Sequence, residues 1–200
     1  CAEQPEPLVP LERSFGVRGR LGPDGELEPL DLTSLPDLGD AEAVAVCLLF
    51  AFRDPSHEAA VATALRERYP GVHVVASHEV APEFREYERA STTAADAYLA
   101  PVAARYLRAL AEGARGAGLP APLVMLSSGG VASIDDAAAH PATLLVSGPA
   151  GGVVGAGLVA RRAGFADAIA FDMGGTSTDV CPLPAGRAAR VSERVVGGLP

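Results

Sequence analysis

The sequence predicts an α/β fold, and two observations carry this prediction. An uninterrupted apolar run at 43–52 is followed by a helical pattern at 55–69 and a second apolar run at 72–76. This order of strand, helix and strand is typical of parallel pairing in α/β proteins. A further apolar run at 168–171 leads into Asp172 and two glycines. It places a carboxylate at the end of a strand, where open α/β sheets bind ligands.

The elements follow one another according to turn and periodicity signals. Residues 17–30 alternate apolar and polar side chains around a Gly-Pro-Asp-Gly turn, which predicts a β-hairpin. Residues 31–40 are expected to form a loop or a short helical turn. The strand at 43–52 is apolar throughout, as is typical of a strand buried on both faces. Pro70 and Gly71 end the helix that follows it.

The second half of the chain begins with a long helical pattern at 83–113. Pro101 predicts a kink or a break, and the preferred division is one helix before it and another at 102–114. Shorter signals predict four further elements: strands at 123–126 and 143–146, a helix capped by Ser133, and a glycine-rich helix at 148–163.

Composition limits the possible partners. All 16 basic residues are arginine and the net charge is −9, which argues against nucleic acid or an anionic membrane surface as the partner. The three cysteines are isolated, and no signal peptide or long apolar span is evident, so we expect a reduced, cytoplasmic protein. The chain begins without methionine and stops at Gly-Gly-Leu-Pro. We therefore expect it to be a piece of a longer protein.

The segment that follows the last predicted strand has the composition of a metal and phosphate site. Gly174 and Gly175 allow the backbone to bring its N–H groups close to an anion. Hydroxyl donors follow at 176–178. Asp172 and Asp179 supply oxygen ligands that suit Mg²⁺. A simple β-hairpin with a Gly-Gly turn is the alternative, and it requires neither aspartate.

Four stretches resemble segments of the hydantoinase A/5-oxoprolinase family and occur in the family's order. They are PEFREYERASTT at 82–93, LSSGG at 126–130, SGPAGGVVGA at 147–156 and FDMGGTSTDV at 171–180. The last one resembles the family's second phosphate-binding hairpin. The resemblance extends from about Arg20 to the end of the chain.

The resemblance implies part of the actin-like (ribonuclease H-like) ATPase fold, a mixed α/β architecture. Residues 1–146 would form the C-terminal part of the N-terminal lobe. Residues 147–200 would form a connecting helix and the first strands of the second lobe. The implied activity is that of an ATP-dependent hydrolase, which opens a cyclic amide of the 5-oxoproline or hydantoin type after ATP phosphorylates the amide oxygen. Since the fold needs two facing phosphate hairpins, we expect this piece alone to be inactive.

The resemblance also implies the roles of individual residues and the partners. Asp172 and Asp179 would be catalytic, and Asp172 would hold Mg²⁺ or its waters. ATP would be bound by Gly148, Gly151, Gly152, Gly174, Gly175, Thr176, Ser177 and Thr178. A small cyclic amide is the expected substrate, and a hydantoinase B/oxoprolinase-type subunit or fused domain is the expected partner.

Other interpretations remain open. The related acetone and acetophenone carboxylases share this type of subunit, and a non-catalytic actin-like nucleotide-binding module is a third possibility. A dinucleotide-binding unit is disfavoured, because the first glycine of its motif would fall on Val146. The small residues at 148–157 serve equally well for close helix packing. Arg85 and Arg89 fall on one helical face, and a solvated, salt-bridged face is the favoured explanation. The alternative is that Arg85 or Arg89 contacts the substrate or the other lobe. The role of 127–130 is left open.

Overall fold

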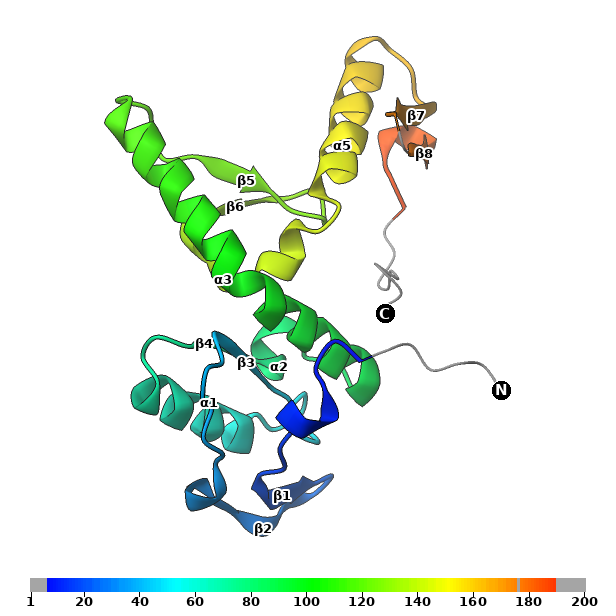
Figure 1. Ribbon diagram of the computed structural model, residues 1–200. Coiled ribbons are helices and arrows are strands. Elements are labelled where there is room, and N and C mark those ends of the chain that lie inside the picture. Colours follow the sequence, from blue (N-terminus) through cyan, green and yellow to red (C-terminus); the bar gives the residue numbers. More distant parts are fainter. Residues whose placement is uncertain (1–6, 176, 190–200) are drawn as a thin grey trace. The chain divides into compact units, whose positions relative to one another are not determined.

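The computed structural model of the protein describes residues 7–175 and 177–189 (Figure 1). Within them the chain forms two compact units, and it passes from the first to the second between Ala103 and Ala104. The long helix α3 (Glu86–Gly116) contains this boundary. Strands and helices are mixed in both units, in agreement with the predicted α/β class.

The first unit opens with the predicted β-hairpin. Strand β1 (Arg18–Gly22) pairs antiparallel with β2 (Gly25–Asp31). Short 3₁₀ helices flank the hairpin at η1 (Leu11–Arg13) and η2 (Leu32–Ser34). The side chain of Asp31 accepts a hydrogen bond from the N–H of Thr33 at 2.9 Å and thereby caps η2. The loop or helical turn expected after the hairpin is confirmed.

The predicted strand–helix–strand unit is also confirmed. Strand β3 (Ala43–Val46) and strand β4 (His73–Ala76) are parallel, and α1 (Ser56–Arg68) connects them. The buried side chains of Val46, Val61 and Leu65 form the core between the strands and the helix. The short helix α2 (Ser77–Val80) follows β4 directly.

The strand expected at 43–52 is shorter than predicted, because β3 ends at Val46. Beyond it, Phe50 adopts a left-handed conformation with φ of 62°. Its carbonyl accepts hydrogen bonds from the N–H groups of Arg53 and Asp54, both at 2.9 Å. An apolar sequence alone does not distinguish a strand from a buried turn, and here the turn forms.

The break predicted at Pro101 is wrong, since α3 is one helix of 31 residues. Proline removes a single backbone hydrogen bond, and packing on both sides of it offsets that loss. Ala97 and Ala100 are buried before it, and Ala104 and Leu107 are buried after it. Like the other helices of the described residues, α3 lacks the combination of length and apolar character that a membrane crossing requires.

The second unit contains a short hairpin, of which only the first strand was predicted. Strand β5 (Leu123–Met125) pairs antiparallel with β6 (Val131–Ser133), and α4 (Ile134–Ala139) follows. Ser133 caps α4 as predicted, because its hydroxyl accepts a hydrogen bond from the N–H of Asp136 at 3.1 Å. The core of this region consists of Leu107, Ile134 and Ala137.

The strand predicted at 143–146 is absent, and the 3₁₀ helix η3 (Pro141–Leu144) lies there instead. Thr143 turns back on His140, whose carbonyl accepts hydrogen bonds from the Thr143 N–H and from its hydroxyl. The glycine-rich helix α5 (Ser147–Arg162) is confirmed. Without a preceding strand, the dinucleotide-binding alternative loses the strand–turn–helix unit that it requires.

The described part of the chain ends in a third hairpin, which packs on α5. Strands β7 (Ala168–Met173) and β8 (Thr178–Leu183) are antiparallel, and the 3₁₀ helix η4 (Pro184–Gly186) follows them. Alternate residues face opposite sides of a strand. One side is buried, with Leu183 1% exposed, whereas Ile169 and Phe171 on the other side are 71% and 63% exposed. This outward-facing side of β7 is called the outer face.

Candidate functional site

The hairpin β7–β8 brings the two predicted aspartates together. Asp172 and Asp179 are direct cross-strand partners, one residue from the ends of their strands. The intervening turn is closed by a hydrogen bond from the N–H of Gly174 to the carbonyl of Ser177 at 3.0 Å. Asp172 is exposed and Asp179 is half-buried. Both carboxylates therefore lie at the turn end of the hairpin, the position that the phosphate-binding prediction requires.

The structure leaves the glycine turn free of obstruction. A Cβ atom added to Gly175 would meet no atom of the described residues within 4 Å. At Gly174 the nearest such contact would be the Ser177 carbonyl oxygen at 3.8 Å. Open space at Gly175 leaves room for an anion beside the turn, whereas the N–H of Gly174 is already used in the hydrogen bond to Ser177. Thr176 lies outside the described residues, and its predicted phosphate contact remains a prediction.

The same end of the hairpin lies beside the glycine-rich part of α5. The carboxylate oxygen Oδ2 of Asp172 is 3.9 Å from the position that a Cβ of Gly152 would occupy. Two groups of residues predicted separately from the sequence, the aspartate hairpin and the glycines of α5, are thus neighbours. The first turn of α5 has no side-chain cap, so its N–H groups keep their capacity to bind a negatively charged group.

The glycines of α5 do not all serve the same purpose. A Cβ on Gly151 would contact Met125 of β5 at 3.5 Å, and one on Gly157 would approach the carbonyl oxygen of Gly186 to 3.2 Å. Gly148, in contrast, has no atom within 4 Å of its Cβ position among the described residues. Close packing explains Gly157, whereas open space at Gly148 is compatible with ligand contact.

The loop at 126–130 also packs against α5. Gly129 has a φ of +80°, and a Cβ there would lie 3.1 Å from the side chain of Val154. The N–H of Ser127 donates to the carbonyl of Thr143 at 2.8 Å. The loop and the hairpin β7–β8 therefore contact the same helix, and α5 is the element around which the candidate site is built.

Two hydrogen bonds fasten the opposite end of the hairpin. Arg161 Nη1 donates to the carbonyl of Gly186 at 2.8 Å. The N–H of Ala185 donates to Asp167 Oδ1 at 2.9 Å. We call these four residues the base clasp. Nothing in the sequence pointed to it, because an arginine in the last turn of a helix ordinarily reflects the helix dipole.

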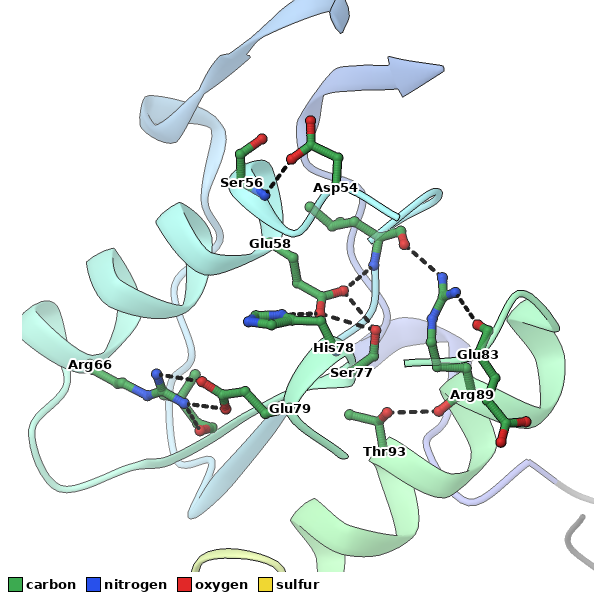
Figure 2. Close-up of polar contacts among 12 residues, drawn as sticks. Asp54, Ser56, Glu58, Arg66, Ser77, His78, Glu79, Glu83, Arg89 and Thr93 are labelled. Atoms are coloured by element: carbon green, nitrogen blue, oxygen red, sulfur yellow. Dashed lines mark hydrogen bonds and ion pairs between the residues drawn. The ribbon is translucent and has the colours of Figure 1, made fainter. Parts of the chain in front are cut away.

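The arginines of the stretch at 82–93 differ in environment. Arg85 is exposed and lies 3.7 Å from Glu88 on the helix surface. Arg89 is only 1% exposed, so the predicted solvated face is wrong for this residue. Its guanidinium donates to the carbonyl oxygens of Glu83 and Leu48, at 2.8 and 2.7 Å (Figure 2). Arg89 therefore ties α3 to the loop that follows β3.

A buried carboxylate beside Arg89 was not predicted. Glu58 of α1 is 0% exposed. It accepts hydrogen bonds from the N–H groups of Leu48 and His78 and from the Ser77 hydroxyl, at 2.7 to 3.0 Å, and it lies 2.7 Å from His78 Nδ1 (Figure 2). No pattern in the sequence indicated this network, because a glutamate in the first turn of a helix usually faces solvent.

No group of three or more histidine, cysteine or acidic side chains that could hold a metal ion occurs within the described ranges. Asp172 and Asp179 form a pair only. The exposed carboxylate of Asp172 nevertheless fits Mg²⁺, which retains several waters and binds through one or two carboxylates together with phosphate oxygens. The arrangement suits a metal held jointly by the protein and a nucleotide.

Comparison with known proteins identifies the family. Residues 89–200 match the family described as hydantoinase/oxoprolinase. The chain belongs to this family. Caprolactamase subunit alpha of Pseudomonas jessenii is 35% identical over 90% of this chain and 27% of its own length. The 5-oxoprolinase of Saccharomyces cerevisiae is 36% identical over 79% of this chain and 12% of its own length.

Solved structures agree with the family assignment. A nucleotide-free structure of acetone carboxylase, from work on ATP-dependent acetone carboxylation, matches 92% of this chain and 28% of its own with a TM-score of 0.79 and 29% identity. The crystal structure of the ATP-dependent caprolactamase matches 91% and 28%, with a TM-score of 0.75 and 33% identity. The chain spans less than a third of the length of these relatives.

Proposed function

We propose that the chain is part of an ATP-dependent enzyme that opens a cyclic amide of the 5-oxoproline or hydantoin type. The observation that carries this proposal is the position of Asp172, an exposed carboxylate beside Gly152 of α5 and across from Asp179. Family membership and amide-hydrolysing relatives support the reaction class. Relatives described as ATP-dependent support the use of ATP.

We propose that the chain forms one part of an actin-like ATPase fold. Residues 1–146 would be the later part of the first lobe. The second lobe would begin after α5, within 147–200, with the hairpin β7–β8 as its phosphate-binding element. The packing of this hairpin on α5 supports the assignment, because it holds the two elements of the proposed nucleotide site together.

Each residue of the site has a proposed role. Asp172 would hold Mg²⁺ or its waters, and Asp179 would orient the hairpin or a water molecule. The phosphate oxygens would be held by Gly148, Gly151, Gly152, Gly174, Gly175, Thr176, Ser177 and Thr178. When bound, Mg²⁺ neutralises charge on the phosphates during transfer. The open space beside Gly148 and Gly175 supports this assignment.

The chemical requirement is activation of a stable bond. An amide oxygen is a poor leaving group until it is phosphorylated, and phosphoryl transfer depends mainly on positioning and on charge stabilisation. Once ATP has transferred its terminal phosphoryl group to the amide oxygen and become ADP, water can add to the ring carbon. The carbon–nitrogen bond then breaks with protonation of the nitrogen, and hydrolysis of the resulting acyl phosphate releases inorganic phosphate. The described residues contain one hairpin of the proposed phosphate-binding type, so we propose that the chain hydrolyses ATP negligibly when separated from the rest of the enzyme.

A ketone carboxylase is the second candidate. The structural match to acetone carboxylase favours it, and acetophenone carboxylase gamma subunit is among the relatives. Several relatives are subunits by name, and a hydantoinase B/oxoprolinase-type partner subunit or fused domain is part of the proposal for either reaction.

ADP release by the complete enzyme, with its partner subunit where one exists, distinguishes the candidates. The assay compares 5-oxoproline and hydantoin with acetone and acetophenone, the ketones being supplied with bicarbonate. We expect Mg²⁺-dependent ADP release with a cyclic amide, accompanied by the ring-opened product. ADP release that only a ketone with bicarbonate stimulates would favour the carboxylase instead. The absence of ATP turnover with every substrate would contradict both proposed reactions.

A further inference from the structure

The base clasp brings two backbones unusually close together. Gly186 has a φ of +68°, and a Cβ there would lie 3.1 Å from the Cγ atom of Arg161. A Cβ on Gly157 would lie 3.2 Å from the carbonyl oxygen of Gly186. Glycine at both positions therefore allows η4 to lie directly against α5. Ala185 also has a positive φ, 51°, although it is not glycine, which indicates that surrounding contacts hold this turn in place.

The base clasp and the proposed metal ligand Asp172 lie at opposite ends of the hairpin β7–β8, which packs on α5. In β7, Asp172 lies four residues beyond Ala168, which pairs with Leu183 at the base. Four residues correspond to about 13 Å at the rise of a β-strand. In α5, Gly152 and Arg161 are nine residues apart, also about 13 Å at the rise of a helix. The hairpin and the helix are thus matched in length between their two points of contact.

This matched length has a mechanical consequence. The hairpin is held to α5 at its base by the Arg161 hydrogen bond, and its inner side packs on the helix as far as Asp172, which lies beside Gly152 near the turn. If the base of the hairpin shifts relative to α5, the hairpin tilts, and the tilt moves the turn end that carries Asp172. The Asp172 carboxylate is exposed, so its surroundings restrain this side chain little. The position of this carboxylate therefore depends on the clasp.

We propose that Arg161 and Asp167 are positioning residues for Asp172, holding its carboxylate where Mg²⁺-nucleotide binds. This inference rests on the proposed function of Asp172. Neither residue touches substrate in this proposal. Arg161 acts through the carbonyl of Gly186, and Asp167 acts through the N–H of Ala185.

The test is a double-mutant cycle in the complete enzyme, with the Mg²⁺ dependence of ADP binding measured by titration calorimetry. Arg161→Ala is compared with Arg162→Ala, an exposed arginine in the same helical turn. Residues that orient a metal ligand typically change metal affinity by about 10- to 100-fold. We expect Arg161→Ala to raise the half-saturating Mg²⁺ concentration about 10-fold, Arg162→Ala to leave it unchanged, and Arg161→Lys, which keeps a donor for Gly186, to restore most of it.

The cycle separates this inference from the proposed function. If Arg161 acts through Asp172, then Arg161→Ala adds little to the effect of Asp172→Asn. Full additivity, or an unchanged Mg²⁺ dependence in a folded Arg161→Ala variant, would overturn the positioning role alone. An unchanged Mg²⁺ dependence in folded Asp172→Asn would overturn the proposed function of Asp172 and this inference with it. If Arg161→Ala does not fold, Asp167→Ala replaces it in the cycle: it removes the acceptor of the Ala185 N–H, and it should also raise the half-saturating Mg²⁺ concentration, whereas an unchanged value in the folded variant would overturn the positioning role.

Discussion

Glu58 and Arg89 bind the two backbone groups of one residue. The Glu58 carboxylate accepts from the N–H of Leu48 at 2.7 Å, and the Arg89 guanidinium donates to the carbonyl of Leu48 at 2.7 Å. Both side chains are almost completely buried. The loop after β3 is thereby fixed to α1 on one side and to α3 on the other.

Replacing Glu58 should destabilise the first unit strongly. Glu58→Ala leaves several buried donors without an acceptor, and each such group costs about 1–3 kcal/mol. We expect the free energy of unfolding to fall by at least about 3 kcal/mol, as measured by urea denaturation followed by circular dichroism. Glu67→Ala, at an exposed position of the same helix, is the control. Equal stability of the two variants would show that the network contributes nothing.

Asp172→Asn should abolish most activity while sparing the fold. Asparagine has nearly the same shape but lacks the charge that Mg²⁺ requires. The loss of a preorganised electrostatic contact reduces kcat by a factor on the order of 10² or more. Mg²⁺-dependent ATP turnover by the complete enzyme provides the measurement, with circular dichroism to verify folding. Asp135→Asn, an exposed aspartate of α4, should behave like wild type. Undiminished turnover in folded Asp172→Asn would remove this residue from the mechanism.

The two glycines of the loop at 126–130 should respond differently to alanine. Gly129→Ala requires a positive φ and places a methyl group 3.1 Å from Val154, so we expect a loss of about 1–3 kcal/mol in unfolding free energy. At Gly130 the nearest contact of an added Cβ is an ordinary 3.6 Å, to Ser128. Gly130→Ala should therefore be close to neutral in thermal unfolding. Similar melting temperatures for the two variants would contradict the packing role of Gly129.

The ion pair between Glu79 and Arg66 should make stability depend on pH in the acid range. Partial burial, the largest single influence, raises the pKa of Glu79, but the hydrogen bond and the charge of Arg66 outweigh it. The pKa therefore lies below its ordinary value of 4.5. A lowered pKa in the folded state gives stability that is present above pH 4.5 and is lost as the pH falls through the folded value.

Glu79→Gln tests this dependence. The pair is partly exposed, with 32% and 45% of the two side chains accessible, so its contribution should remain below about 1 kcal/mol. Urea unfolding of wild type and variant should differ at pH 7, and the difference should disappear in strong acid. Glu112→Gln, an exposed site on α3, should show no such trend. A difference that persists at low pH would mean that the charge is not its cause.

Local signals were sufficient for much of the fold. Turn residues predicted the hairpin β1–β2, helical spacing predicted α1, and the cap at Ser133 predicted the start of α4. The predictions were wrong where contacts between residues distant in sequence override the local preference for a helix break or a strand. The helix α3 continues through Pro101 because buried residues support it on both sides, and the predicted strand at 143–146 is replaced by a turn that Thr143 forms with His140.

The candidate site divides in the same way. The sequence indicated Asp172, Asp179 and the glycine turn because these residues follow one another closely within the single stretch 171–180. The proximity of Gly152 to Asp172 could not be read from the sequence, since it depends on how α5 and β7 pack. The Glu58 network and the base clasp were missed for the same reason, because their hydrogen bonds use backbone groups that every residue possesses.

The outer face of β7 affects how the isolated polypeptide behaves during purification. Ile169 and Phe171 form an apolar row on one face of a narrow hairpin, and exposed apolar surface of this kind favours association between molecules. The net charge of −9 provides repulsion that salt progressively screens. Aggregation should therefore increase with ionic strength, and a lysine in place of Phe171 should suppress it by placing a charge on the surface where molecules would otherwise stack.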